Sequence, residues 1–560
     1  MDLKMQEELR TQLNEYKSKQ VNENERKVVI DKWETYKKKI KDNTLSLDDY
    51  TNNVNNGPNN PVDYLCNFLE NHTQCFGLSR PGSANQFGVK KNKDITYYIQ
   101  GKGKLITKNE NATKDEANEV FEKYIKPLLK NIVDLSDKLN SENENIEDKI
   151  SEIDALIEND YDGYNYSAKQ ILRKMVVLNQ PELFIEIYSA DIIKTLYKEF
   201  LPDGTKEKIL LQSYSLLQNF KDLNNDLSVR NISRFLWDFY NKTFPVNEES
   251  PNVIFYGSPG TGKNYQVEKM KAYIMMNDDC YESVQFHPSF TYEDFIEGIK
   301  PKGVNKDGNI TFGLVNGVFK EFCIKAKKNR NKKYYFIVDE INRANLSTVF
   351  GEALSLLEKD YRHKADKPNE NLIKTQYSSL IEDLIRESED KEKYIRLAYD
   401  YCETSKEVKF GIPDNVYFIG MMNDVDKSID TFDLALRRRF KWIRKECDYN
   451  VIKDIVNDKN KHYLNIEDYS NACKKLNEYI CDKLNLGKSY EFGHSFFMKI
   501  TAIAKKENIS HEDMTKLFDD YLRPTLREYL RAFFSENEID GKLQEALGEF
   551  IKNIKEKSHD

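Results

Sequence analysis

The stretch with the clearest chemistry is GSPGTGKN, residues 257–264, which follows an apolar run and opens a helical pattern. Glycines in such a loop let successive backbone N–H groups point at phosphate oxygens, and the start of the helix adds a favourable field. Lys263 supplies a positive charge to the β- and γ-phosphates. The stretch therefore predicts a nucleotide-binding loop made of Gly257, Ser258, Pro259, Gly260, Thr261, Gly262, Lys263 and Asn264.

Asn264 departs from this motif, which ordinarily ends in a Ser or Thr whose hydroxyl binds Mg²⁺. The amide oxygen of Asn264 can still bind a magnesium ion or its water, but its side chain is longer than that of Ser or Thr and carries no hydroxyl proton. We therefore predict that Asn264 belongs to the metal site, that nucleotide binding survives, and that hydrolysis is slower or differently tuned.

Two acids follow the apolar run YYFIV, which reads as a buried strand. In open α/β sheets, ligands bind at the carboxyl ends of the strands. Asp339 is predicted to hold Mg²⁺ directly or through water, and Glu340 to orient the water that attacks the γ-phosphate. The alternative, an ordinary acidic strand end, is disfavoured by the phosphate loop upstream in the same α/β region.

A further strand end, FIGMMNDVDKS, carries Asn423, whose neutral amide can bond both a γ-phosphate oxygen and the attacking water. Downstream, Arg437, Arg438 and Arg439 are adjacent. An arginine supplied by a neighbouring subunit can stabilise charge on the transferred phosphoryl group. For at least one of the three we expect a solvated surface charge instead.

Four short apolar runs must position these groups: NVIFYG, YESVQF, YYFIVDE and NVYFIGMMN, separated by helical segments. Such a pattern is typical of buried parallel strands in an α/β domain. After about residue 450 the pattern is helical. We predict a multidomain α/β plus α protein: a P-loop NTPase with a parallel sheet and a helical lid, preceded by an α+β and helical N-terminal region.

The length of 560 residues favours several domains. We expect N-terminal helices at 1–50, a small α+β module at 51–135 that is a candidate for target recognition, and an acidic linker with a helical region at 136–245. The NTPase core is expected at 246–450, with a charged helical insertion at 362–413. A helical lid and C-terminal helices are expected at 451–560.

Composition excludes several classes of protein. A net charge of -8 argues against a chain that coats nucleic acid over its whole surface, so any DNA contact must be local. The eight cysteines form no C-x-x-C pair, so neither a disulfide framework nor a zinc site is indicated. Without a signal-peptide pattern near residue 1, or an apolar run of about 18 residues, we expect a cytoplasmic protein without membrane contact.

Six motifs resemble the McrB-type AAA+ proteins, the GTPase subunits of modified-cytosine-specific (type IV, McrBC-like) restriction systems. They are VIFYGSPGTGK, VQFHPSFTYEDFIEGIKPKG, YYFIVDEINRANLSTVFGEALSLLE, NVYFIGMMNDVDKSIDTFDLALRRRF, GHSFFM and LRPTLREYL, across roughly residues 250–530. The resemblance implies a ring, commonly a hexamer, with nucleotide between neighbouring subunits. It also implies GTP rather than ATP, and a separate McrC-type partner that stimulates hydrolysis and carries the nuclease.

Residue roles carry over from this resemblance by position. Asn423 would orient the attacking water, and Asp426 would belong to the loop that responds to the partner. Arg343, in EINRAN, and the cluster from Arg437 to Arg439 would reach the neighbouring nucleotide.

We therefore expect a GTP-hydrolysing, Mg²⁺-dependent AAA+ ring motor of a DNA-restriction or anti-phage complex, acting on plain or modified DNA and not itself the nuclease. ATP stays open as the substrate, since no residue chooses the base. Two other functions stay open: a MoxR-like ATP-dependent protein-remodelling ATPase, and a nucleotide-gated DNA-binding module with little turnover.

Overall fold

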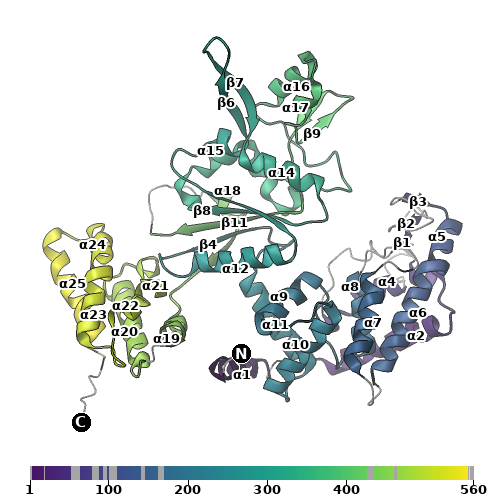
Figure 1. Ribbon diagram of the computed structural model, residues 1–560, viewed down its shortest axis with the longest axis horizontal. Helices are drawn as coiled ribbons and strands as arrows, with labels where there is room; N and C mark the ends of the chain where they lie inside the picture. The colour runs from purple at the N-terminus through teal and green to yellow at the C-terminus, as the bar shows by residue number, and fades with distance from the viewer. Residues whose placement is uncertain are drawn as a thin grey trace. The chain divides into compact units, whose positions relative to one another are not determined.

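The computed structural model describes residues 3–17, 19, 21–51, 64–77, 88–91, 97–99, 110–140, 145–159, 161, 169–425, 434–458, 463–552 and 554. The chain divides into two compact units, Met1–Lys242 and Thr243–Asp560 (Figure 1). Each unit has its own hydrophobic clusters. Within the described residues, no helix is long and apolar enough to cross a bilayer.

The N-terminal unit is mainly helical. Its helices are α1 (Leu3–Lys17), α2 (Glu23–Lys41), α3 (Leu47–Tyr50), α4 (Leu65–Asn71), α5 (Lys114–Val120), α6 (Lys126–Asp137), α7 (Ile146–Glu158), α8 (Lys169–Asn179), α9 (Ala190–Phe200), α10 (Ile209–Leu223) and α11 (Val229–Thr243). A small antiparallel sheet joins β1 (Val89–Lys91), β2 (Tyr97–Ile99) and β3 (Glu110–Ala112).

One hydrophobic cluster of this unit runs from Val29 on α2 to Leu211 on α10. The cluster therefore contains residues from all three predicted N-terminal segments, 1–50, 51–135 and 136–245. The acidic stretch after residue 140 contains α7, which buries Ile150, Ile153 and Ile157 on one face. Apolar residues at this spacing make the helix amphipathic, so it packs into the unit despite its many acids.

The C-terminal unit contains a five-stranded parallel sheet in the order β12-β4-β11-β8-β5. Its strands are β4 (Asn252–Gly257), β5 (Cys280–Gln285), β8 (Tyr334–Asp339), β11 (Val416–Asn423) and β12 (Lys441–Arg444). The predicted parallel α/β sheet is confirmed. The edge strand β12 was not predicted, because KWIR is short and only half-buried.

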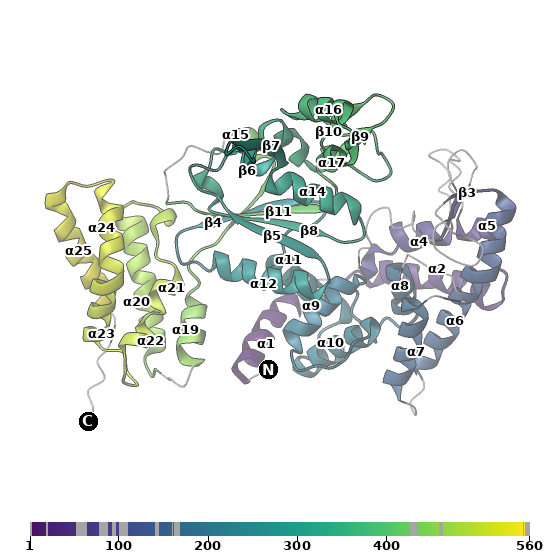
Figure 2. The same ribbon diagram turned by 45° about the horizontal axis from the view of Figure 1, so that its top comes forward.

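Helices cover both faces of this sheet. In Figures 1 and 2, α12 (Lys263–Met276) lies on one face, and α14 (Val318–Lys328) and α15 (Leu346–Phe350) lie on the other. Phe336 and Phe418, on the central strands β8 and β11, are fully buried. Phe319 of α14 packs edge-on against Phe336, with ring centroids 5.0 Å apart. A sheet covered on both faces explains why the strands are almost continuously apolar.

Two insertions extend this domain. α13 (Tyr292–Phe295) leads into an antiparallel hairpin of β6 (Glu297–Val304) and β7 (Ile310–Asn316). Residues 362–413 contain α16 (Ser378–Glu387) and α17 (Lys391–Ile395), and also a strand pair, β9 (Asp400–Cys402) and β10 (Glu407–Lys409), which the sequence did not predict.

The chain ends in a helical bundle, which confirms the predicted lid. After the short α18 (Leu434–Arg437) and β12, the bundle comprises α19 (Tyr449–Asp458), α20 (Ile466–Glu478), α21 (His494–Phe497), α22 (Ile500–Ile503), α23 (His511–Leu517), α24 (Arg523–Arg531) and α25 (Glu536–Ile551). Tyr469, Phe518 and Phe550 are fully buried at its centre.

Candidate nucleotide-binding site

The predicted phosphate loop connects β4 to α12. Gly260 and Gly262 both have φ near +79°, a left-handed conformation that residues with a Cβ adopt only with strain. Gly262 is the N-cap of α12, so the first N–H groups of this helix have no intrahelical acceptor. Thr261 Oγ1 donates to the carbonyl of Ser258 at 2.9 Å and closes the loop from inside. The loop thus has the form of an anion cradle.

Lys263 and Asn264 begin α12 but point to different surroundings. Lys263 is only 6% exposed, and its Nζ donates to the carbonyl oxygens of Gly257 at 3.0 Å and Ser258 at 2.8 Å. Its ammonium group therefore lies against the loop backbone. Asn264 is exposed on the first turn of the helix. The structure thus brings together all eight residues predicted for the loop.

The two predicted acids lie at the end of β8. Asp339 Oδ1 accepts a hydrogen bond from the N–H of Glu340 at 2.9 Å. Glu340 has φ of +50°, unusual for a residue with a side chain, and such strain is often found at functional sites. Its carboxylate accepts from Arg343 Nε at 3.1 Å and from Asn423 Nδ2 at 3.3 Å. Glu340 is therefore held in place from two sides.

Strand register brings these groups to one edge of the sheet. Gly257 lies opposite Asn423 in the β4–β11 pair, and Val338 lies opposite Gly420 in the β11–β8 pair. The carboxyl ends of β4, β8 and β11 therefore meet where the phosphate loop begins. The N–H of Asp424 also donates to the carbonyl of Gly257 at 3.3 Å.

The predicted arginines differ in their surroundings. Arg439 is 11% exposed, with Nε 3.2 Å from Glu358 Oε1 and Nη1 donating to the carbonyl of Ala435 at 2.7 Å. Arg438 is 67% exposed and lies 3.4 Å from the same carboxylate. Arg437 is exposed at the end of α18. Asp426, predicted to respond to a partner, lies outside the described residues.

Arg343 lies beside Glu340 of its own chain, and its side chain is 43% exposed. Within this chain it therefore contacts Glu340, the acid predicted to be catalytic.

The lid contacts the phosphate loop through residues 488–498, which we call the lid strap. The N–H of Gly493 donates to the carbonyl of Pro259 at 3.2 Å, and the N–H of Ser495 donates to the carbonyl of Gly260 at 3.1 Å. A Cβ on Gly493 would lie 2.1 Å from the carbonyl carbon of Gly260. Gly493 is therefore what allows the two backbones to approach so closely.

A second contact ties the strap to the sheet edge. Ser489 Oγ donates to Asp424 Oδ2 at 3.0 Å, and Arg444 Nη2 lies 3.3 Å from the same oxygen. Asp424, Ser489 and Gly493 were not predicted as site residues from the sequence. Their only sequence signals were the position of Asp424 beside Asn423 and the motif GHSFFM.

The described residues contain no cluster of three or more His, Cys, Asp or Glu side chains that could hold a metal ion unaided. Mg²⁺, however, is usually bound through one or two carboxylates together with substrate phosphates and water. Asp339 at the strand end and the amide of Asn264 at the start of α12 provide oxygen donors of the kind Mg²⁺ prefers. The residues present fit a magnesium ion that binds together with a nucleotide.

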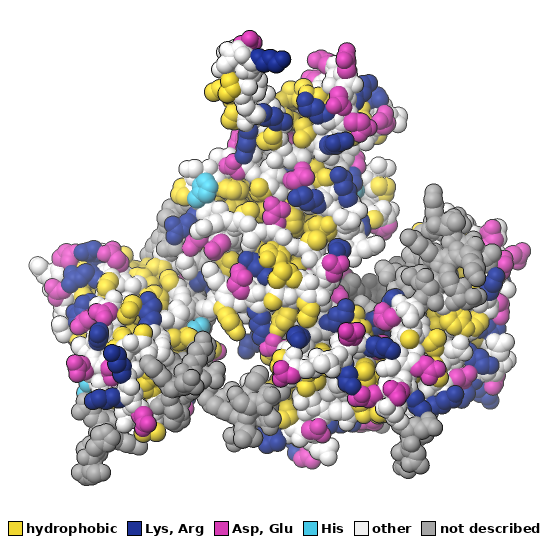
Figure 3. All heavy atoms as spheres, viewed as in Figure 1, with side chains coloured by type: hydrophobic (Ala, Val, Ile, Leu, Met, Phe, Trp, Pro, Cys, Tyr) yellow, Lys and Arg dark blue, Asp and Glu magenta, His cyan; other side chains and the backbone are white. Residues whose placement is uncertain are grey.

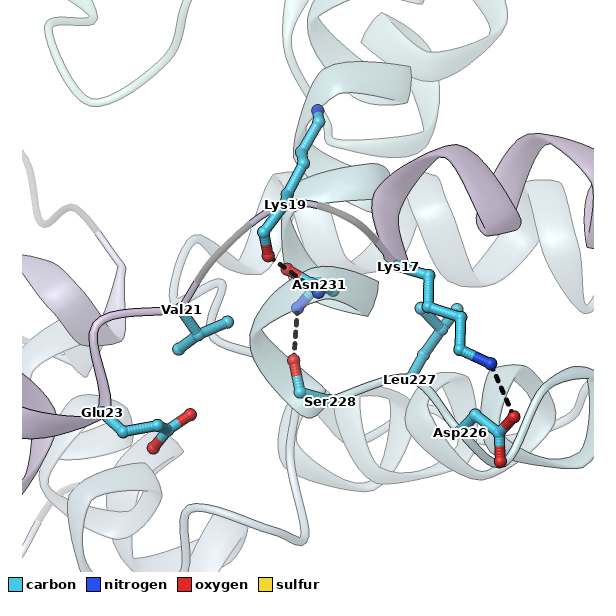
Figure 4. A pocket seen from close by; sticks show the side chains of 8 residues that line it. All are labelled: Lys17, Lys19, Val21, Glu23, Asp226, Leu227, Ser228 and Asn231. Carbon is cyan, nitrogen blue, oxygen red and sulfur yellow. Dashed lines mark hydrogen bonds and ion pairs between the residues drawn. The ribbon is translucent and has the colours of Figure 1, made fainter.

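The N-terminal unit has an open pocket of about 350 Å³, shown in Figure 4. Lys17 Nζ contacts Asp226 Oδ2 at 2.7 Å, and Asn231 Nδ2 donates to the carbonyl of Lys19 at 3.3 Å. Glu23 also lines the pocket. The two lysines are offset by two acids, so the charge does not favour an anion there.

The β6–β7 hairpin has an apolar, basic surface. Figure 3 shows hydrophobic and basic side chains together on the projecting hairpin. The exposed apolar residues there are Ile299, Val304, Ile310 and Phe312.

Comparison with known proteins places two family models on the C-terminal unit. Residues 252–440 match the AAA domain of the dynein-related subfamily, and residues 468–536 match the alpha-helical lid domain of McrB. The first match covers the sheet and the phosphate loop. The second covers most of the helical bundle, including the lid strap.

Two curated relatives are similar over the same region. The type IV methyl-directed restriction enzyme EcoKMcrB subunit of Escherichia coli (strain K12) is 35% identical over 252 residues, which is 44% of this chain and 47% of that protein. The type II restriction enzyme BsuMI component YdiS of Bacillus subtilis (strain 168) is 28% identical over 212 residues, 34% of this chain and 56% of that protein. The chain thus spans about half the length of these relatives.

A solved putative ATPase from Cytophaga hutchinsonii ATCC 33406 matches 57% of this chain and 81% of its own length, at 13% identity. The TM-score is 0.22, too low for a comparison of the two folds.

Proposed function

We propose that this chain, which belongs to the McrB-type AAA+ proteins, hydrolyses GTP as the ring motor of a McrBC-like DNA-restriction complex. AAA+ domains are P-loop NTPases that use a nucleotide with Mg²⁺. The choice of GTP, the ring and the partner subunit are the parts that go beyond this family assignment.

One observation carries the proposal: the phosphate loop, the acids at the end of β8 and Asn423 lie at one edge of one sheet. Glu340 and Asn423 are joined by a hydrogen bond of 3.3 Å, although they come from different strands. Phosphoryl transfer needs little covalent participation by the protein, so catalysis depends on positioning and on stabilising charge. Residues that converge in this way can do both.

The residues of this chain have distinct proposed roles. The N–H groups at the start of α12 bind the phosphates, and Lys263 turns its ammonium from the loop carbonyls to the phosphate oxygens. Glu340 accepts a hydrogen bond from the attacking water, while the Asn423 amide fixes both Glu340 and the water. Asp339 and Asn264 would hold Mg²⁺, which when bound neutralises charge on the phosphates.

A ring would supply the remaining charge. Arg437 and Arg438 are both exposed, and we propose that one of them extends to a nucleotide on a neighbouring copy. Arg439 is largely buried against Glu358 and is assigned to the fold of its own chain. Arg343 is proposed to reach the neighbouring nucleotide as well, and its Nε contacts Glu340 within the single chain.

The names of the relatives support the proposed partners. One is a subunit of a methyl-directed restriction enzyme, and the other is a component of a restriction enzyme. We infer that this chain likewise works with a separate McrC-type nuclease subunit, that the loop containing Asp426 responds to that subunit, and that the N-terminal unit reads DNA.

Phosphate release by the full chain tests the proposal. GTP and ATP are compared with Mg²⁺, with and without duplex DNA and an McrC-type subunit, and Lys263→Ala is the inactive control. We expect hydrolysis of GTP above ATP, increased by the partner and reduced at least 100-fold in the control, as expected for loss of a charge on the transferred group. ATP preference without any effect of DNA or partner would support a protein-remodelling ATPase instead. Tight binding with no turnover would support a nucleotide-gated binding module.

A further inference from the structure

His494 is the first residue of α21 and lies in the middle of the lid strap. The sequence favours a packed or hydrogen-bonded histidine over a metal ligand at this position. In the structure, its Nδ1 accepts a hydrogen bond from the N–H of Asp448 at 3.3 Å. A neutral imidazole whose Nδ1 is an acceptor carries its hydrogen on Nε2. His494 thus has one free donor direction, on the side of Nε2.

The Nε2 side of the ring faces the phosphate loop. A Cβ built on Gly262 would lie 3.1 Å from Nε2 and 3.3 Å from Cε1 of His494. Gly262 caps the helix that begins with Lys263, and N–H groups at such a position face bound phosphates. The imidazole therefore lies beside the glycine that caps α12, on the lid side of the phosphate loop.

The position of the ring is fixed by backbone contacts on both sides of His494. Gly493 and Ser495 each donate an N–H to the loop, to the carbonyl oxygens of Pro259 and Gly260. With the Asp448 contact to Nδ1, three hydrogen bonds hold the ring and its flanking backbone in place. A donor oriented in advance loses little freedom when a ligand binds, which favours a functional contact.

The charge around His494 suits a neutral donor. Burial is the main cause that lowers the pKa of His494, and Lys445 lowers it further, while Asp448 acts in the opposite direction. The ring is therefore neutral near pH 7. Lys263 then remains the cation of the loop, and His494 adds a directional N–H donor.

We propose that His494 Nε2–H donates a hydrogen bond to the diphosphate part of the bound nucleotide and so couples the lid to the phosphates. This inference rests on the proposed function, since it needs a nucleotide on the loop. It predicts that GTP and GDP lose affinity alike when His494 is replaced, because both carry the diphosphate. Guanosine, which has no phosphate, should be unaffected.

The test measures Kd by calorimetry on the full chain with Mg²⁺, using GDP, a slowly hydrolysed GTP analogue and guanosine. His494→Ala should weaken diphosphate binding about tenfold, as for loss of a hydrogen bond to a charged group. His494→Gln, which restores an N–H donor, should recover most of the affinity. The melting temperature without nucleotide should differ little among the three proteins, because the proposed contact exists only with ligand.

Two results would overturn the inference. One is wild-type diphosphate affinity in His494→Ala. The other is equal weakening in both variants together with a lower melting temperature without nucleotide, which would show that the ring only packs against Gly262. The proposed function is judged separately: if the wild-type chain binds no nucleotide and matches Lys263→Ala, that proposal fails and this one falls with it.

Discussion

Replacing Gly493 by alanine tests the contact between the lid strap and the phosphate loop. Gly493 has φ of -69° and ψ of 157°, a conformation open to any residue, so alanine causes no backbone strain of its own. The added Cβ would nevertheless lie 2.1 Å from the carbonyl carbon of Gly260 and 2.5 Å from the carbonyl oxygen of Pro259. The effect of the substitution is therefore purely steric.

The size of the effect follows from the two hydrogen bonds at this place. Carbon atoms pack at about 3.5 Å or more, so the two backbones must separate by more than about 1 Å. The bonds from Gly493 and Ser495, 3.2 and 3.1 Å long, would then break. At about 1 kcal/mol each, their loss favours the open lid by about 2 kcal/mol, or about 30-fold.

Native-state hydrogen exchange measures this opening directly at the N–H of Ser495. We expect Gly493→Ala to lower its protection about 30-fold and to weaken nucleotide binding. Gly541→Ala is the matched control, because Gly541 lies in α25 and a Cβ there would meet nothing within 4 Å. That control should leave Ser495 unchanged and stabilise α25 slightly. Unchanged protection of Ser495 in Gly493→Ala would refute the described contact.

Three further predictions concern single residues. Asn264→Thr restores the usual hydroxyl, so we expect tighter Mg²⁺ binding and faster turnover, measured by magnesium titration of phosphate release; equal values would show that the position is neutral. Arg438→Ala should abolish turnover, and mixing it with Glu340→Gln subunits should restore turnover, because each protein then supplies the residue that the other lacks. Arg439→Ala should instead lower the melting temperature, since the Arg439 side chain is only 11% exposed and contacts Glu358. Burial raises the pKa of Asp154 to about 6, so its contribution to stability is present below about pH 4 and lost as pH rises through 6. The unfolding free energy of Asp154→Asn minus that of the wild type should therefore increase by up to about 3 kcal/mol between pH 4 and pH 7, measured by urea unfolding. A difference between the two proteins that does not change with pH would contradict the raised pKa.

The candidate site could be located from the sequence because its parts follow apolar strands. Parallel strands align their carboxyl ends, so Lys263, Asp339, Glu340 and Asn423 had to lie near one edge once the strands were recognised. The fold class follows from the same alternation of strands and helices.

Contacts between distant segments could not be predicted in this way. The lid strap reaches the phosphate loop through backbone hydrogen bonds, which no side-chain pattern encodes. Arg437, Arg438 and Arg439 are alike in sequence, and only packing shows that the Arg439 side chain is mostly covered and lies against Glu358. The strands β9 and β10 are three residues each, too short for a clear alternation of apolar and polar residues.

A single-turnover experiment with Glu340→Gln tests the central claim most directly. The amide cannot accept a proton from the attacking water, while the phosphate loop and Asp339 are unchanged. We predict that the variant binds GTP with a Kd close to that of the wild type and releases phosphate at least 100-fold more slowly. Phosphate release at the wild-type rate would contradict the claim that this edge of the sheet is the hydrolytic site.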